Sequence, residues 1–188
     1  MNATIQAPAS QCLYFDMEGV LCAYNKSDYR PGRNGEPARA DTHGAHMYLG
    51  VPENPNVMQA FCMLYGFMPP GTCKVFTGVP NGITHAEHVI DKFNWMKKRL
   101  STFRQEDFLC VSVDDYADPV PPPYILNRGQ ILIDDYDPNL ANWTALGGLS
   151  VKCLNGLNSR NPAYYNLDAG ARPGDIMNAI LAVLQGRM

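Results

Sequence analysis

Four residues with oxygen-bearing side chains follow short apolar runs in this sequence, and their types and positions suit chemistry on a charged ligand. Each stands where a predicted strand ends: Asp16, Thr77, Asp134 and Asp135. In an open α/β sheet, ligands bind beyond the carboxyl ends of the strands, so we expect these side chains to converge. Three carboxylates need a compensating cation, and hard oxygen ligands favour Mg²⁺. A carboxylate beside Mg²⁺ and facing a phosphoryl group is a competent nucleophile.

The strands that position these residues are short and almost continuously apolar, which is typical of strands buried on both faces of a parallel sheet. We expect five of them, at residues 12–15, 73–76, 109–113, 131–133 and 149–153. Helical patterns lie between them or after them, at residues 56–67, 84–100, 137–143 and 176–184. The alternation predicts an α/β fold, a doubly wound, Rossmann-like parallel sheet with helices on both faces.

One helix has a well-defined apolar pattern. Over residues 84–100 the apolar stripe is predicted to consist of Val89, Phe93, Met96 and Leu100. Lys97 and Lys98 then fall at the solvated end of this helix, where the macrodipole favours cations. The stripe predicts which face of the helix packs against the sheet.

Two stretches interrupt the alternation of strands and helices. Residues 24–55 are rich in Gly, Pro, Arg and His and follow the first strand directly, so we expect a short cap insertion over the carboxyl edge of the sheet. Tyr24 and Arg30 are its candidate substrate contacts, although a polar loop without that role explains the same residues. Residues 114–130 contain four prolines and predict a stiff loop. With 188 residues, the whole chain (1–188) is expected to be one domain that includes this cap.

The composition excludes several classes of protein. Hydrophobic residues make up 46% of the sequence and charged residues 18%, which excludes a disordered chain or an extended coiled coil. A net charge of −3 argues against a binder of polymeric nucleic acid, which needs a basic face. We expect no membrane span, because no apolar run approaches about 20 residues, and no signal peptide. Six cysteines without a CxxC pair predict a reduced, cytoplasmic protein.

The sequence around these strand ends resembles three motifs of the haloacid dehalogenase (HAD) superfamily of phosphotransferases. DMEGVL at residues 16–21 is similar to motif I, FTG at 76–78 to motif II, and IDD at 133–135 to motif IV. Their order and strand context agree over most of the chain. More narrowly, DKFNWMKK at 91–98 and DDYDPNLANW at 134–143 resemble the K-x-x-W and D-D-x-x-x-N-x-x-x-W stretches of the 5'(3')-deoxyribonucleotidase branch.

The resemblance implies a role in phosphoryl transfer for each matching residue. Asp16 is the nucleophile, and Glu18 is the general acid/base, at a position where motif I usually has Asp. Family members that resemble enolase-phosphatases carry Asp-x-Glu-Gly there, so the change is compatible with activity. Thr77 and Gly78 contact the phosphoryl group of the substrate, and Gly19 lets the chain turn sharply beneath it.

The resemblance also implies the ligands of a Mg²⁺ ion. Asp16 and Asp134 bind the metal through their carboxylates, and Glu18 binds it through its backbone carbonyl. Asp135 assists through a water molecule. The implied metal set therefore combines the ends of the first and fourth predicted strands.

One element of the family pattern is missing. Motif III supplies a lysine shortly before motif IV, whereas no lysine occurs between Lys98 and Lys152 in this chain. Arg128 is the nearest cation in the sequence and our candidate replacement, with Lys97 or Lys98 reaching in from the preceding helix as alternatives. A guanidinium can bind phosphate in a bidentate manner but does not mimic a compact ammonium group.

These observations leave two hypotheses of different classes. The first is a Mg²⁺-dependent phosphomonoester hydrolase that works through an aspartyl-phosphate, acting on a nucleoside monophosphate or another small phosphorylated metabolite. The alternative is a catalytically degenerate HAD-like protein that lacks the motif III lysine and binds a nucleotide or a protein partner. The discriminating feature is whether Arg128, Lys97 or Lys98 points its charge at the Asp16 carboxylate.

Overall fold

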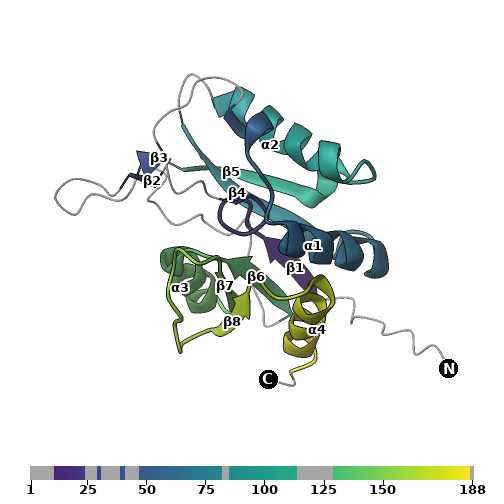
Figure 1. Cartoon of the computed structure of the whole chain (residues 1–188), viewed down its shortest axis with the longest axis vertical. Helices are drawn as coiled ribbons and strands as arrows, with labels where there is room; N and C mark the ends of the chain where they lie inside the picture. The colour runs from purple at the N-terminus through teal and green to yellow at the C-terminus, as the bar shows by residue number, and fades with distance from the viewer. Residues whose placement is uncertain are drawn as a thin grey trace.

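The computed structural model describes residues 11–23, 47–81, 85–113 and 129–186, together with two short strands at 29–30 and 39–40. Its centre is a six-stranded sheet in which each hydrogen-bonded pair of neighbours runs parallel (Figure 1). The strand order across the sheet is β5-β4-β1-β6-β7-β8. In chain order these strands are β1 (Cys12–Phe15), β4 (Cys73–Pro80), β5 (Phe108–Val113), β6 (Gln130–Asp134), β7 (Leu149–Leu154) and β8 (Tyr165–Asp168).

The strand order places β1 at the switch point of the sheet. From β1 the chain moves to β4 and β5 on one side, and then returns to β6, β7 and β8 on the other. A parallel sheet wound in two directions from a central strand opens a crevice at the carboxyl ends of the central strands, and ligands bind there. The predicted doubly wound α/β fold is confirmed, and its crevice lies at the end of β1.

Helices cover both faces of the sheet. α1 (Pro55–Phe67), α2 (His85–Arg99) and α4 (Pro173–Leu184) pack on one face, and α1 lies beside α4 (Figure 1). α3 (Asp137–Ala145) covers the other face, where Leu140 and Trp143 pack on Tyr14 and Leu132. Successive strand residues point to opposite faces, so Leu13 and Phe15 join the larger core while Tyr14 joins the smaller one.

The observed strands agree with the predicted ones except in two places. β4 continues past Thr77 to Pro80, so Thr77 lies inside a strand rather than after it. β8 was absent from the expected elements because its sequence, YNLD, has no apolar run. It is an edge strand in which only Leu167 is buried, and such a strand needs little apolar sequence.

The buried face of α2 differs from the predicted apolar stripe. Asp91, Lys92, Trp95 and Met96 are buried, whereas Val89, Phe93 and Leu100 are only partly buried. Burying a lysine is costly unless its charge is paired, so the helix needs a carboxylate to meet Lys92. Helical periodicity counts apolar residues and cannot reveal such a partner.

The predicted cap, residues 24–55, is described only in part. β2 (Tyr29–Arg30) and β3 (Arg39–Ala40) pair antiparallel, and a 3₁₀ helix, η2 (Met47–Gly50), begins the segment that returns to α1. The rest of the cap up to residue 46, and residues 114–128 of the proline-rich stretch, lie outside the described residues. A second 3₁₀ helix, η3 (Gln105–Asp107), precedes β5.

The returning segment of the cap is anchored to α2. Trp95 Nε1 donates a hydrogen bond to the Val51 carbonyl at 2.8 Å, and Arg99 Nη2 donates to the same oxygen at 3.1 Å. Arg99 Nε also pairs with Glu53 Oε2 at 2.8 Å. These contacts hold the chain between η2 and α1 against α2.

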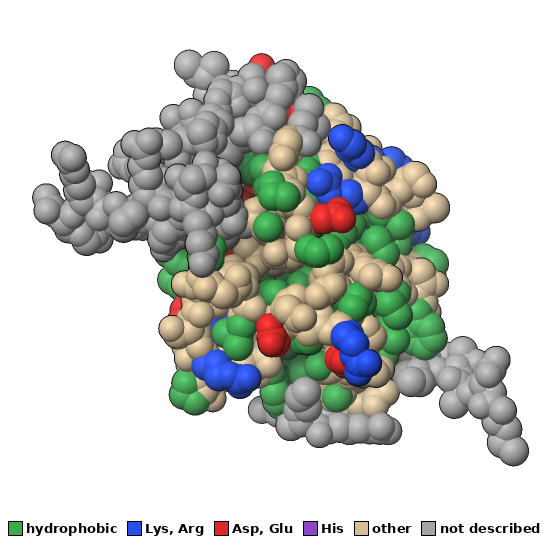
Figure 2. Space-filling model, in the orientation of Figure 1, with side chains coloured by type: hydrophobic (Ala, Val, Ile, Leu, Met, Phe, Trp, Pro, Cys, Tyr) green, Lys and Arg blue, Asp and Glu red, His purple; other side chains and the backbone are tan. Residues whose placement is uncertain are grey.

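The surface of the described residues mixes side-chain types. On the face shown in Figure 2, Lys and Arg side chains stand in separate groups beside acidic and hydrophobic ones. Among the described helices, none combines the length and the apolar character that crossing a membrane requires.

Candidate active site

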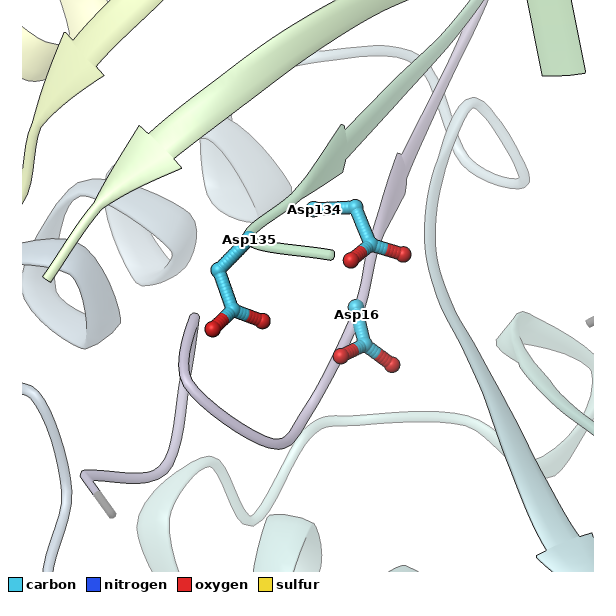
Figure 3. Close-up of side chains that lie close together, drawn as sticks. All are labelled: Asp16, Asp134 and Asp135. Atoms are coloured by element: carbon cyan, nitrogen blue, oxygen red, sulfur yellow. The ribbon is translucent and has the colours of Figure 1, made fainter. Parts of the chain in front are cut away.

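Three carboxylates converge at the carboxyl edge of the sheet (Figure 3). Asp16 follows β1, Asp134 ends β6, and Asp135 comes next, and one oxygen of each lies within 4.8 Å of the others. The parallel register of β1 and β6 produces this arrangement, because Phe15 pairs with Ile133 and the Asp16 N–H donates to the Ile133 carbonyl at 3.0 Å. The structure therefore brings together the three aspartates that the strand ends pointed to.

Local hydrogen bonds fix the orientation of Asp134. Its Oδ1 accepts from the backbone N–H of Tyr136 at 2.8 Å, and its Oδ2 accepts from Asn139 Nδ2 at 2.9 Å. Both donors belong to the first turn of α3 or the residue before it. Asp134 is 2% exposed, so the start of α3 holds a buried carboxylate in one orientation.

Burial and mutual repulsion raise the pKa values of all three aspartates. Burial, and then the charges of Asp134 and Glu18, hold the pKa of Asp16 well above its ordinary value. Burial raises the pKa of Asp134 to about 6, against hydrogen bonds that lower it. Burial and the charge of Asp134 raise the pKa of Asp135 to about 8. The three groups thus hold protons tightly, and a divalent cation that displaces those protons would satisfy the same oxygens.

A second cluster lies on the β4 side of Asp16 and contains a buried lysine. Lys92 Nζ contacts Glu18 Oε1 at 2.7 Å and donates to Thr77 Oγ1 at 2.8 Å and to the Gly78 carbonyl at 2.7 Å. Thr77 Oγ1 in turn donates to Glu18 Oε2 at 3.0 Å. The Lys92 side chain is fully buried, and Glu18 is the carboxylate that its burial requires.

Lys92 keeps its charge in this environment. Burial by itself lowers the pKa of a lysine, yet the carboxylate of Glu18, at ion-pair distance, raises the pKa of Lys92 above its ordinary value. The ring of Tyr48, from η2, lies 4.8 Å from Nζ and adds a cation–π contact. The returning segment of the cap therefore contributes a residue to the packing of this lysine.

The turn between the two clusters depends on Gly19. Its φ of +78° lies in the left-handed region, and a Cβ there would come within 2.3 Å of Asp135 Oδ2. The Gly19 carbonyl accepts hydrogen bonds from Asn54 Nδ2 at 3.3 Å and from Asn155 Nδ2 at 3.1 Å. Only glycine fits both the conformation and the space, so the sharp turn expected here is present.

Several predicted site residues fall elsewhere. Lys97 Nζ donates to the backbone carbonyls of Ser101 and Phe103 beyond the end of α2, and Lys98 is exposed. Neither contacts the described acidic residues of the site, because both lie on the last turn of the helix. Arg128 and Tyr24 lie outside the described residues, and of Arg30 only its place in β2 is described.

Lys92 is the residue that the sequence interpretation missed. The family pattern places the balancing lysine shortly before motif IV, whereas Lys92 comes 15 positions after Thr77 and on the opposite side of β1. One signal was available: Lys92 and Trp95 are spaced i, i+3, which places both on one helix face. A lysine on the same face as a large buried aromatic residue indicates a paired, buried charge.

Two solved structures to which this chain is similar are described as phosphatases. D,D-heptose 1,7-bisphosphate phosphatase from B. bronchiseptica, complexed with magnesium and phosphate, superposes with a TM-score of 0.56 at 10% sequence identity, covering 93% of this chain and 99% of that one. A protein assigned as a HAD-like phosphatase from Mesorhizobium loti gives a TM-score of 0.47 at 13% identity, with 97% and 91% covered. No protein-family model and no curated protein matches the sequence. The chain thus has a parallel α/β, Rossmann-like fold similar to that of the heptose bisphosphate phosphatase.

Proposed function

We propose that this protein is a Mg²⁺-dependent phosphomonoester hydrolase in which Asp16 forms an aspartyl-phosphate intermediate. The observation that carries the proposal is the position of Asp16 between the two clusters. On one side stand Asp134 and Asp135, and on the other stands the Lys92–Glu18 ion pair. A carboxylate so placed has metal ligands beside it and a fixed positive charge nearby, as nucleophilic attack on a phosphate monoester requires.

The residues present fit a Mg²⁺ ion. The donor atoms are carboxylate oxygens of Asp16, Asp134 and Asp135, which are hard ligands that converge on one point. Among the described residues, four carboxylates, counting Glu18, lie near one ammonium group, that of Lys92, and a divalent cation would balance the remaining carboxylates. The bound ion would neutralise charge on the phosphoryl oxygens and orient them. The resemblance to motif I adds the backbone carbonyl of Glu18 as a further ligand.

Phosphoryl transfer to the protein is the first step of the proposed reaction. A carboxylate oxygen of Asp16 forms a bond to phosphorus, and the bond from phosphorus to the ester oxygen breaks. The leaving alkoxide takes a proton from Glu18, and the alcohol departs. Thr77, whose hydroxyl lies between Glu18 and Lys92, is placed to hydrogen-bond the phosphoryl group in this step.

Hydrolysis of the intermediate is the second step. Glu18, now a carboxylate, accepts a proton from a water molecule whose oxygen attacks phosphorus. The bond from phosphorus to Asp16 breaks, which releases inorganic phosphate and restores the carboxylate. The ion pair with Lys92 at 2.7 Å and the hydrogen bond from Thr77 at 3.0 Å hold the Glu18 carboxylate in place for both steps.

The proposed substrate is a small phosphorylated metabolite, and a nucleoside monophosphate is the first class to test. Its support is the resemblance of residues 91–98 and 134–143 to the deoxyribonucleotidase branch. Two residues of these stretches contact site residues: Lys92 forms an ion pair with Glu18, and Asn139 donates a hydrogen bond to Asp134. Both tryptophans are buried. The two stretches support the phosphate chemistry, and the cap at residues 24–55 of the one-domain chain is the proposed location of specificity.

The alternative, a degenerate binding protein, rests on the missing motif III lysine and the proline-rich loop in its place. Lys92 supplies a buried ammonium group within 2.7 Å of Glu18 and 2.8 Å of Thr77. A binding protein has no need to keep a buried lysine paired with the general acid/base position. This ion pair therefore favours the enzyme.

The proposal is tested by measuring release of inorganic phosphate, with and without Mg²⁺, from nucleoside monophosphates, deoxynucleoside monophosphates, sugar phosphates and p-nitrophenyl phosphate. We expect turnover that depends on Mg²⁺ and falls at least about 10³-fold in Asp16→Asn, which keeps the shape of the side chain but loses the nucleophile. Asn139→Ala is a useful intermediate variant, since it frees Asp134 without removing a carboxylate. Full activity in Asp16→Asn would exclude the mechanism, and a folded, Mg²⁺-binding protein without turnover would favour the binding protein.

A further inference from the structure

Asn155 stands directly after β7, at the same edge of the sheet as the carboxylate cluster. Its Nδ2 donates to Asp135 Oδ2 at 2.8 Å and to the Gly19 carbonyl at 3.1 Å. The other end of the amide is also fixed, because Asn155 Oδ1 accepts from the Leu157 N–H at 3.0 Å. This acceptor role identifies which end of the amide carries the hydrogens, so the donor end faces the acidic site.

A second asparagine holds the backbone of the same aspartate. Asn158 Nδ2 donates to the Asp135 carbonyl at 3.1 Å and to the Cys153 carbonyl at 2.8 Å. Asn158 Oδ1 accepts from the Asn155 N–H at 3.3 Å, which links the two asparagines. The turn after β7 thus forms hydrogen bonds with both the main chain and the side chain of Asp135.

Asp135 needs such a restraint because burial and the charge of Asp134 both disfavour its carboxylate form. It is close to two buried carboxylates, Asp16 and Asp134, and their repulsion would turn it away from them. The bond from Asn155 occupies Oδ2, and one oxygen of Asp135 points toward Asp16 (Figure 3). A hydrogen bond that fixes one carboxylate oxygen also fixes the direction of the other.

We propose that Asn155 is a positioning residue that aims the Asp135 carboxylate at the metal site and holds the Gly19 turn against it. The inference rests on the proposed function, since it concerns the affinity of the same site for Mg²⁺. Through Gly19, the amide connects the loop that carries the nucleophile with the loop that carries Asp135. Asn155 touches neither phosphorus nor the leaving group, so its effect is on the assembly of the site.

The experiment compares Asn155→Ala with Asn166→Ala. Asn166 is a matched control, because its Nδ2 also donates twice, to the Asn161 and Tyr164 carbonyls, and its Oδ1 accepts from the Asn161 N–H. Mg²⁺ affinity is measured by calorimetry in the absence of substrate. Melting temperatures without metal report the structural cost of each substitution, and turnover is recorded as a function of Mg²⁺ concentration.

We expect Asn155→Ala to weaken Mg²⁺ binding about 10-fold or more, as loss of a partner that orients a ligand generally does. Its turnover should recover as Mg²⁺ is raised, with little change in the KM of the substrate. Asn166→Ala should lower the melting temperature without changing Mg²⁺ affinity. If Asn155→Ala does not fold, Asn155→Leu, which keeps the size of the side chain but has no donor, provides the same comparison.

Two failures are distinguishable. A wild-type protein that binds Mg²⁺, together with an Asn155 variant that binds it equally well, would overturn the positioning role alone. A wild-type protein that neither binds Mg²⁺ nor releases phosphate would overturn the proposed function and this inference with it. Equal loss of Mg²⁺ affinity in Asn155→Ala and Asn166→Ala would show a general structural effect and would also overturn the specific role.

Discussion

The buried carboxylates on the two sides of Asp16 are neutralised in different ways. On the β6 side, Asp134 and Asp135 stand beside Asp16 with no described cation in contact, and their pKa values rise to about 6 and about 8. On the β4 side, Glu18 has a full internal counterion in Lys92. One half of the site is complete within the chain, whereas the other half is complete only with a bound cation.

This difference shows how a site can be both preorganised and switchable. The Lys92 side is fixed by packing and hydrogen bonds, so its charge is in place before a substrate arrives. The aspartate side exchanges protons for a metal, so its charge depends on pH and on metal concentration. Substitutions on the two sides should therefore differ in whether added Mg²⁺ can compensate for them.

The largest losses of stability and turnover are expected from Lys92→Met, which removes the Lys92–Glu18 ion pair. It leaves the carboxylate of Glu18 without its counterion, at a cost of about 2–3 kcal/mol in the free energy of unfolding. This is below the usual cost for a fully buried pair, because Glu18 remains 21% exposed. Turnover should fall at least about 100-fold and should not recover at high Mg²⁺.

Chemical denaturation and phosphate release check this prediction, with Lys98→Met as the control. Lys98 lies on the same helix but is exposed, so its loss should change stability by less than about 0.5 kcal/mol. Equal behaviour of the two variants would contradict the importance of the ion pair. Recovery of Lys92→Met by Mg²⁺ would contradict the distinction between the two sides.

A smaller loss of stability is expected from Gly19→Ala, which changes the turn between the Lys92 side and the aspartate side. The positive φ and the 2.3 Å approach to Asp135 Oδ2 predict a loss of about 1–3 kcal/mol in stability. Because Asp135 must move, Mg²⁺ affinity should fall as well. Thermal denaturation with and without Mg²⁺ measures both effects.

Gly66→Ala is the matched control for Gly19→Ala. Gly66 lies within α1, and a Cβ there meets nothing within 4 Å. Since alanine favours helix more than glycine does, this variant should be more stable by about 0.4–1 kcal/mol. Two alanine substitutions with effects of the same sign would show that the steric argument at Gly19 is wrong.

The last prediction concerns the pH dependence of the melting temperature of the metal-free protein. Burial raises the pKa values of Asp134 and Asp135 to about 6 and about 8, while in the unfolded chain an aspartate titrates near 4. Between these values the folded protein binds more protons than the unfolded chain. Its free energy of unfolding must therefore fall as the pH rises from about 5 to about 8.

Melting temperatures recorded across this pH range, with a chelator and then with Mg²⁺, measure that dependence. The metal-free protein should melt at a lower temperature at pH 8 than at pH 5. Mg²⁺ should stabilise it most at pH 8, where fewer protons compete for the carboxylates. A metal-free melting temperature that is flat or rises over this range would contradict the balance of charges described for the aspartate side.

The aspartate side could be predicted from the sequence, and the lysine side could not. Asp16 and Asp134 end strands whose apolar runs are local signals, and the parallel order of the strands then brings them together. Lys92 stands within a helix, and its role depends on Glu18, which is 74 residues earlier in the chain. The roles of Asn155 and Asn158 likewise depend on carbonyl and carboxylate partners that no local pattern reveals.

The base of the cap has a consequence for how such a protein acquires new specificity. The Ala23 N–H donates to the Pro52 carbonyl at 2.9 Å, and the Asn54 N–H donates to the Leu21 carbonyl at 2.8 Å, so the two ends of the insertion are joined at a narrow neck. The entropic cost of closing a loop grows slowly with loop length. Insertions of different length and composition can therefore replace one another above that neck with little loss of stability. Evolution or an engineer could thus replace the proposed cap, provided that a residue in the place of Tyr48 keeps packing against Lys92.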